Sequence, residues 1–181
     1  MRSRAENADV MVETPRLELR PQAEADAAFM LVLVNDPAWL RYIGDRGVRT
    51  LQDARRYIRE GALKMYDEHG FGLYLVVLKK ARTPVGICGL VKREGLGDVD
   101  LGFAFAPEYR GRGYAREAAE ATVAYARDVL GLRRLVAIAA PDNAASLKLL
   151  AGLGFTFEQI VNLPDGDTVH LLSRRLAEQE V

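Results

Sequence analysis

The spacing of hydrophobic and polar residues near the start of the chain predicts one strand followed by two helices. Residues 17–20 alternate apolar and polar side chains, which is typical of a short strand. Segment 23–34 is rich in Ala, Leu and Met and favours a helix that ends at Asn35-Asp36-Pro37. A second helix follows, because Thr50 to Asp53 resembles a capping box and apolar residues then recur at helical spacing to about Glu68.

The period then changes to that of strands. Segments 72–79, 85–92 and 98–106 are strand-like and are separated by short turns, which predicts an antiparallel meander. The third segment carries a large apolar face opposite a more polar one. The apolar face holds Val99, Leu101, Phe103 and Phe105, and the other holds Asp98, Asp100, Gly102 and Ala104.

The rest of the chain alternates helices and strands. Helices are predicted over 114–130 and from Asn143 to Gly154, and strands over 134–139, 155–161 and 168–175. The order β-α-α-β-β-β-α-β-α-β-β indicates an α/β (α+β) fold, with a mixed, largely antiparallel central sheet flanked by helices.

The length suits one domain, since 181 residues lie within the usual range of a single domain. We expect a flexible N-terminal tail at 1–12, one folded domain at 13–177 and a frayed C-terminus at 178–181.

Composition excludes several classes of function. The 25 basic and 25 acidic residues give a net charge of zero, which argues against a strong pull on nucleic acid or acidic membranes. No apolar run approaches the roughly 20 residues of a membrane span, and residues 1–10 lack the apolar core of a signal peptide. We therefore expect a cytoplasmic protein. Cys88 cannot form an internal disulfide, and with His69 and His170 it falls short of a metal site.

The junction between strand and helix at 107–116 carries most of the chemical information. Its sequence combines Gly111, Gly113 and Ala115 with three arginines and one glutamate, a local charge of +2. Helix N-termini expose unpaired N–H groups, and small residues let a bulky anion approach the backbone. The segment therefore predicts a phosphate-binding cradle; a tight turn bearing surface arginines is the plain alternative.

Three phosphate motifs can be compared with this segment. It lacks the Gly-Lys-Ser/Thr of a P-loop, and Arg116 stands where the dinucleotide fingerprint requires its last glycine. The remaining pattern, Arg-x-x-Gly-x-Ala at Arg110, Gly113 and Ala115, resembles the acetyl-CoA diphosphate motif of the GNAT N-acetyltransferase superfamily.

A second motif strengthens this resemblance. Asn143, Ser146 and the later Leu153-Gly154-Phe155 are similar to the GNAT segment that packs beside coenzyme A, although a simple helix cap would also explain Asn143. The opening segment 13–21, together with Asp100-Leu101-Gly102-Phe103 and Pro107-Glu108-Tyr109, resembles the branch containing ribosomal-protein N-terminal acetyltransferases.

The resemblance implies a GNAT-like acyl-CoA N-acyltransferase fold and transfer of an acetyl group from acetyl-CoA to an amine by direct attack. The acceptor would be a small molecule or a protein N-terminus, with no metal, and the enzyme a monomer or homodimer. Coenzyme A would be bound by the strand backbone, the cradle and the start of the later helix. These positions are Phe103, Ala104, Phe105, Arg110, Gly111, Arg112, Gly113, Tyr114, Ala115, Asn143 and Ser146.

The resemblance also suggests groups that handle protons. Asp100 lies on the less apolar strand face and is a candidate base acting through a water, with Asp98 and Glu108 as other candidates; acids that simply solvate a surface are the alternative. Leu150 occupies the position of the tyrosine acid of many relatives, so Ser146 is the candidate that bonds the sulfur of coenzyme A, unless it only contacts the cofactor or caps the helix.

Several interpretations stay open on sequence alone. The loop residues Trp39, Tyr42, Ile43 and Gly44 either line the acceptor pocket or pack. Cys88 is expected to be a buried hydrophobe rather than a nucleophile. A catalytically silent acyl-CoA sensor or scaffold is the alternative function, and a nucleotide-binding enzyme is a third, disfavoured by the missing P-loop lysine.

Overall fold

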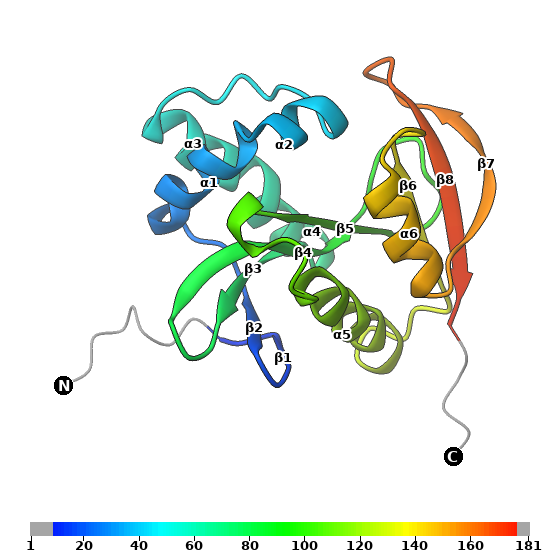
Figure 1. The fold of residues 1–181 in the computed structure, drawn as a ribbon, viewed down its shortest axis with the longest axis horizontal. Helices are drawn as coiled ribbons and strands as arrows, with labels where there is room; N and C mark the ends of the chain where they lie inside the picture. The colour runs from blue at the N-terminus through cyan, green and yellow to red at the C-terminus, as the bar shows by residue number, and fades with distance from the viewer. Residues whose placement is uncertain (1–8, 177–181) are drawn as a thin grey trace.

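An eight-stranded mixed sheet forms the centre of the computed structural model, which describes residues 9–176. The strands are β1 (Val12–Glu13), β2 (Leu17–Arg20), β3 (Leu73–Leu78), β4 (Thr83–Val91), β5 (Asp100–Phe105), β6 (Arg134–Ala139), β7 (Thr156–Asn162) and β8 (Thr168–Arg175). Their order across the sheet is β1-β2-β3-β4-β5-β6-β8-β7 (Figure 1). Every neighbouring pair is antiparallel except β5 and β6, which are parallel. The expected fold class is confirmed.

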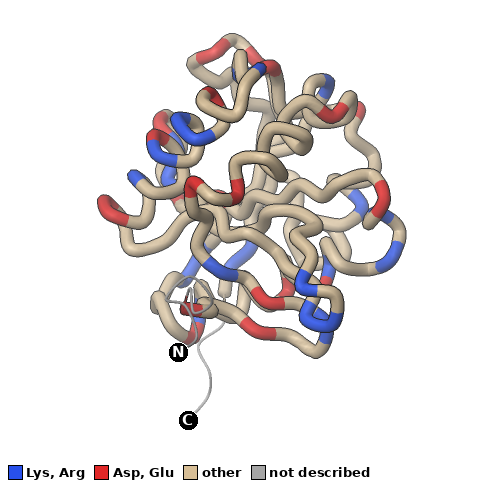
Figure 2. The backbone as a smooth tube through the Cα atoms, turned by 90° about the vertical axis from the view of Figure 1, so that its left-hand side faces the viewer, with Lys and Arg blue, Asp and Glu red and all other residues tan. Residues whose placement is uncertain are grey.

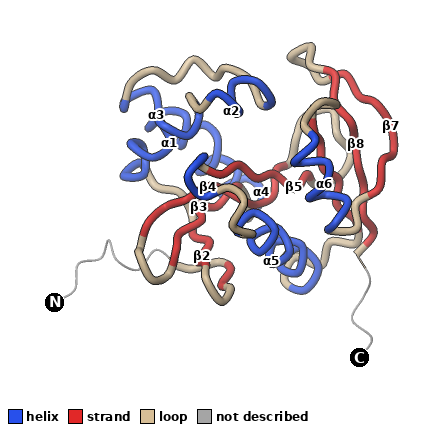
Figure 3. The backbone as a smooth tube through the Cα atoms, in the orientation of Figure 1, coloured by secondary structure: helices blue, strands red, loops and turns tan. Residues whose placement is uncertain are grey.

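Helices flank this sheet, as Figure 3 shows. They are α1 (Ala27–Val34), α2 (Pro37–Tyr42), α3 (Leu51–Ile58), α4 (Lys64–His69), α5 (Tyr114–Asp128) and α6 (Ala144–Gly152), with short 3₁₀ turns η1 (Glu24–Asp26) and η3 (Pro107–Tyr109). A π-helical turn, η2 (Arg59–Leu63), joins α3 to α4.

The two faces of the sheet pack against different helices. Leu75, Val77 and Ile87 point into a cluster with α1, α2 and α3. Their neighbours on the same strands, Val76 and Cys88, point into a second cluster that contains the apolar side of α5. This alternation follows from the two-residue period of a strand. Both faces of β3 and β4 are thereby withdrawn from water.

Cys88 behaves as the sequence led us to expect. Its side chain is fully buried, with Sγ 3.4 Å from the hydroxyl of Thr122. Burial raises the pKa of the thiol to about 12, so the thiol carries no nucleophilic thiolate near neutral pH.

Three local features differ from the sequence prediction. Val12 pairs with Leu19 in a short strand, so the predicted tail ends before residue 12. Residues 37–42 form α2 instead of a loop, because Asp36 caps the helix at the Ala38 N–H and Pro37 fits the first helical position. The helix predicted to 68 contains the π-turn. Residues 1–8 and 178–181 of the predicted termini lie outside the described residues.

Positions of acidic and basic residues are mixed along the fold and are not separated onto different faces. Figure 2 shows Lys and Arg positions interspersed with Asp and Glu positions, in keeping with the equal numbers of the two. Between residues 9 and 176, no helix has the length and apolar character needed to cross a membrane.

The close approach of β3 and β4 gives a test of the fold. A Cβ on Gly89 would lie 2.1 Å from the carbonyl oxygen of Gly72, a backbone atom that cannot move alone. We predict that Gly89→Ala lowers the free energy of unfolding by about 3 kcal/mol, measured by urea denaturation. Gly97→Ala is the matched control, since a Cβ there meets nothing within 4 Å. Equal stability of the two variants would contradict this packing.

Candidate functional site

The parallel pairing of β5 and β6 brings two loops to one edge of the sheet. The chain leaves β5 into the loop before α5, and leaves β6 into the loop before α6. Because parallel strands end at the same edge, the loops at 106–113 and 140–143 lie on the same side of the molecule (Figure 1). Both sequence motifs therefore come together, although Arg110 and Asn143 are 33 residues apart in the chain.

The β5–β6 pair is short. Strand pairing links only Asp100 with Val136, where the Val136 N–H donates to the Val99 carbonyl at 3.0 Å. On its other side, β5 pairs with β4 along its whole length, from Asp100 to Phe105. Beyond Asp100, the side of β5 that faces β6 therefore has no strand partner among the described residues.

Strand geometry identifies the backbone groups left on that side. The Ala106 N–H donates to the Val85 carbonyl, so Ala106 faces β4. Backbone groups alternate in direction along a strand, so Ala104 also faces β4, while Phe103 and Phe105 face the other side. The Phe105 carbonyl is bonded by the Arg110 side chain at 3.0 Å. The Phe103 backbone and the Phe105 N–H remain for a ligand, whereas the predicted ladder contact of Ala104 is not available.

The start of α5 presents a row of N–H groups that have no partner among the described residues. Glu117 makes the first helical bond, to the Gly113 carbonyl, and no described hydrogen bond engages the backbone N–H groups from Gly111 to Arg116. Gly111 and Gly113 have φ values of 73° and 81°, a conformation that glycine adopts at little cost. The predicted cradle is therefore an exposed turn of bare backbone at a helix N-terminus, the arrangement that favours an anion.

The arginine side chains of the cradle differ in position. Arg110 is turned toward the protein, where its Nη2 lies 2.7 Å from Asp36 Oδ2 and its Nε bonds the Phe105 carbonyl. These contacts fix Nε and Nη2, whereas Nη1 has no described partner and the side chain is 44% exposed, so the predicted contact of Arg110 with a diphosphate stays a prediction. Arg112 is exposed, with its guanidinium 5.8 Å from the centre of the Tyr109 ring. Arg112 thus remains available to an anion.

The second motif forms the start of α6. Asn143 is the N-cap, as its Oδ1 accepts a 3.2 Å hydrogen bond from the Ser146 N–H. Ser146 is half-buried, and its hydroxyl has no hydrogen-bond partner among the described residues. Leu150 is buried in the core and offers no proton donor. The structure thus shows Asn143 as a helix cap. Contact of Asn143 or Ser146 with coenzyme A stays a prediction.

Asp100 lies at the point where β5 and β6 part, and it is not the surface acid that the sequence allowed. Its side chain is 1% exposed, and Oδ2 accepts two 3.1 Å hydrogen bonds from Arg93. Burial raises the pKa of this carboxyl to about 6, against the opposing effect of the Arg93 guanidinium. A base that holds a water must be reached by water, so Asp100 serves in that role only if the ion pair opens.

Comparison with protein families decides the assignment that this geometry suggests. Residues 16–156 match the model of the acetyltransferase (GNAT) domain. The chain belongs to the GNAT family of acetyltransferases. It is therefore an acyltransferase, and the strand edge and cradle described above lie within the matched region.

Individual proteins are similar to the chain over most of their length. The chain is 28% identical over 160 residues to the uncharacterized protein YkkB of Bacillus subtilis, covering 86% of this chain and 90% of that protein. A GNAT-family acetyltransferase structure from Bordetella pertussis is 29% identical, with a TM-score of 0.76 and coverage of 92% and 99%. RimL, a ribosomal L7/L12 alpha-N-protein acetyltransferase solved with coenzyme A, shares the fold at 19% identity, with a TM-score of 0.78 and coverage of 93% and 98%.

In this GNAT domain, α2 is attached to both motif loops. Asp36, its N-cap, pairs with Arg110 of the cradle, and Arg41 in its last turn pairs with Asp142, next to Asn143, at 2.9 Å. The Arg41 pair is exposed and contributes little energy by itself. Trp39 is buried in the α1–α3 cluster, so for this residue the packing interpretation is correct.

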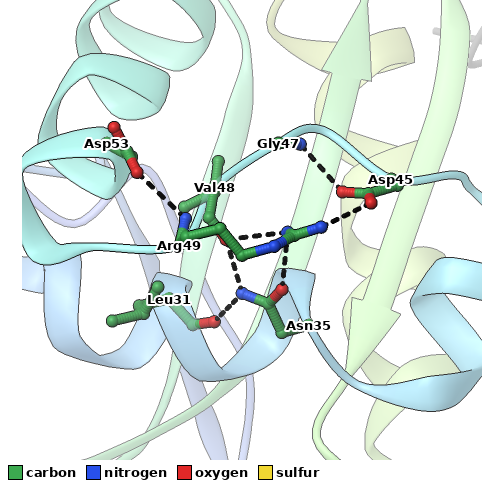
Figure 4. A network of polar contacts seen from close by, with 7 residues as sticks. All are labelled: Leu31, Asn35, Asp45, Gly47, Val48, Arg49 and Asp53. Carbon is green, nitrogen blue, oxygen red and sulfur yellow. Dashed lines mark hydrogen bonds and ion pairs between the residues drawn. The ribbon is translucent and has the colours of Figure 1, made fainter.

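The segment after α2 is held by a polar network around Arg49 (Figure 4). The Arg49 guanidinium bonds Asn35 Oδ1 at 3.0 Å and pairs with Asp45, while Asn35 Nδ2 bonds the Val48 carbonyl at 2.9 Å. The Arg49 backbone N–H donates to Asp53 in the first turn of α3. These contacts connect the end of α1 to the start of α3 and fix the loop between them.

The environment of Asp100 predicts how stability changes with pH. A pKa of about 6 lies above that of an unfolded aspartate, so the native state binds this proton more tightly. Its stabilising contribution is full below about pH 4 and is lost as pH rises through about 6. We predict that wild type loses up to about 3 kcal/mol relative to Asp100→Asn over this range, measured by urea denaturation. A gain in wild-type stability over this range would instead show that the Arg93 guanidinium lowers the pKa of Asp100 by more than burial raises it.

Proposed function

We propose that this GNAT protein is an N-acetyltransferase that transfers the acetyl group of acetyl-CoA to a primary amine of a small molecule or of a protein N-terminus. Two features found together carry the proposal. One side of β5 has no strand partner beyond Asp100, and the N–H groups of the described cradle, from Gly111 to Arg116, make no described hydrogen bond. The first suits the amides of the pantetheine arm, which can add to a strand edge as another strand would. The second suits the diphosphate.

The proposed chemistry is direct attack within a ternary complex. The neutral amine nitrogen forms a bond to the thioester carbonyl carbon, and the carbonyl oxygen becomes an oxyanion that an N–H on the free side of β5, at Phe103 or Phe105, stabilises. Collapse breaks the carbon–sulfur bond and the thiolate leaves. The nitrogen, which became positively charged on attack, gives one proton to water, and water protonates the thiolate, so the products are the amide and the thiol of coenzyme A. The Ser146 hydroxyl, which no described residue engages, donates a hydrogen bond to that sulfur.

The acceptor ammonium group must lose a proton before its nitrogen can attack. This loss needs no buried base when the acceptor is an α-amino group. Such a group has a pKa of about 7.7–8.0 and is partly neutral near pH 7, whereas an alkylamine with a pKa of about 10.4 is almost fully charged. Because Asp100 is closed off by Arg93, its role as base depends on opening of that pair, and we propose an acceptor that ionises near neutral pH.

Ligand binding is the first test of the proposal. A ligand that binds only the native state stabilises it by about 2.7 kcal/mol at 100 times its Kd, which raises the melting temperature by roughly 5–10 °C in a domain of this size. We predict such a shift with acetyl-CoA and none with ATP. No shift at millimolar acetyl-CoA would contradict the proposal. Release of free thiol with an amine panel then distinguishes the enzyme from a silent acyl-CoA sensor.

Substitution of Ser146 tests the chemical step. Ser146→Ala removes the hydroxyl but keeps the backbone N–H that bonds Asn143, so the helix start is retained. We predict a fall in kcat of roughly 100-fold, with the Kd for coenzyme A little changed. Lys148→Ala, at another position of the same helix, is the control. An unchanged kcat would assign Ser146 a purely structural role.

A further inference from the structure

The N-terminal hairpin is bonded to the first turn of α5 through Glu117. Its carboxylate accepts hydrogen bonds from the Thr14 hydroxyl at 2.6 Å, from the Arg16 backbone N–H at 3.0 Å and from Arg16 Nε at 2.6 Å. Thr14 is itself held by the turn, since its hydroxyl oxygen accepts from the Leu17 N–H at 2.9 Å. Glu117 of α5 therefore holds Arg16 at two points, its backbone N–H and its guanidinium, although 101 residues separate the two in the chain.

The fixed guanidinium reaches the cradle itself. Arg16 Nη1 donates a 3.0 Å hydrogen bond to the carbonyl of Arg112. Its Cζ lies 4.4 Å from the centre of the Tyr114 ring, and a Cβ placed on Gly113 would be 3.3 Å from its Nη2. Arg16 thus contacts residues on both sides of Gly113, and the absence of a side chain at Gly113 leaves room for it.

The bond to the Arg112 carbonyl has a directional consequence. In a trans peptide the C=O of one residue and the N–H of the next point in opposite directions. A donor fixed on the Arg112 carbonyl therefore directs the Gly113 N–H away from Arg16, toward the open side of the turn. Arg112 lies between two glycines with positive φ, in a conformationally permissive stretch that has no side-chain cap of its own.

Arg16 also offsets an unfavourable charge. Glu117 is an acid in the first turn of α5, where it suits the helix dipole but repels an anionic ligand. The ion pair with Arg16 neutralises it at 2.6 Å, and the Glu117 side chain is only 18% exposed. The positive end of the helix is thereby left to the ligand.

We propose that Arg16 is a positioning residue for diphosphate binding: it fixes the Arg112–Gly113 peptide so that the Gly113 N–H faces the ligand, and it cancels the charge of Glu117. This inference rests on the proposed function. It assigns Arg16 no contact with the reacting atoms. The specific consequence is that Arg16 matters for ligands that carry the diphosphate and not for the pantetheine arm, which β5 binds.

Binding of two probes to the full chain tests the proposal. Titration followed by nuclear magnetic resonance gives the Kd for coenzyme A and for S-acetylpantetheine, which lacks every phosphate. We predict that Arg16→Ala weakens coenzyme A about tenfold, the loss of one charge-assisted positioning contact, and leaves S-acetylpantetheine within about twofold. Arg16→Lys gives an intermediate loss, since one ammonium replaces a guanidinium that bonds Glu117 and the Arg112 carbonyl together.

Arg82→Ala is the matched control. Arg82 pairs with Glu18 at 2.6 Å, the same distance as the Arg16–Glu117 pair, and its side chain is 62% exposed against 46% for Arg16, but Arg82 makes no described contact with residues 107–116. We predict that it changes neither Kd. Equal weakening of both probes in Arg16→Ala and Arg16→Lys would show a merely structural role, and no weakening of either would also overturn the proposal. If wild type fails to bind coenzyme A, the proposed function itself fails.

Discussion

The site depends on one constraint: β6 pairs with β5 at a single position and then leaves it. A complete ladder would have satisfied the backbone of β5 on both sides and left a ligand nothing to bond. Because the pairing ends at Asp100, the Phe103 backbone and the Phe105 N–H have no strand partner in the described part of the chain. The buried Arg93–Asp100 pair lies at this point of departure, where a lone carboxylate would be costly. Strand, cradle and the start of α6 are then placed along one edge.

Three arginines in this part of the fold are paired with acids and hold backbone carbonyls, so their charge is not fully free for a ligand. Arg110 pairs with Asp36, Arg16 with Glu117, and Arg49 with Asp45. Each guanidinium also bonds a main-chain carbonyl, so each fixes the direction of a peptide. The proposed anion site consists largely of N–H groups, and Arg16 and Arg110 hold the peptides beside them. A local charge of +2 therefore overstates the charge that is free to meet a ligand.

The sequence predicted the parts of the structure that depend on local pattern. The strand 98–106, the cradle at its end and the capped helix at Asn143 follow from alternation, small residues and capping chemistry. It could not predict contacts set by the tertiary fold. The Arg16–Glu117 bonds join positions 101 residues apart, and the burial of Asp100 depends on how the chain packs around the start of β5. Nor could it show that Arg110 is turned toward Asp36, since the motif specifies a residue type and no direction.

Amide hydrogen exchange, read residue by residue with and without saturating acetyl-CoA, shows whether the ligand adds to the free side of β5. We predict that the Phe103 and Phe105 N–H groups become strongly protected when the ligand binds, while the Ala104 N–H, which faces β4, keeps its exchange rate. This alternation is the signature of a ligand added along one side of the strand. Binding of acetyl-CoA with unchanged exchange at Phe103 and Phe105 would contradict it.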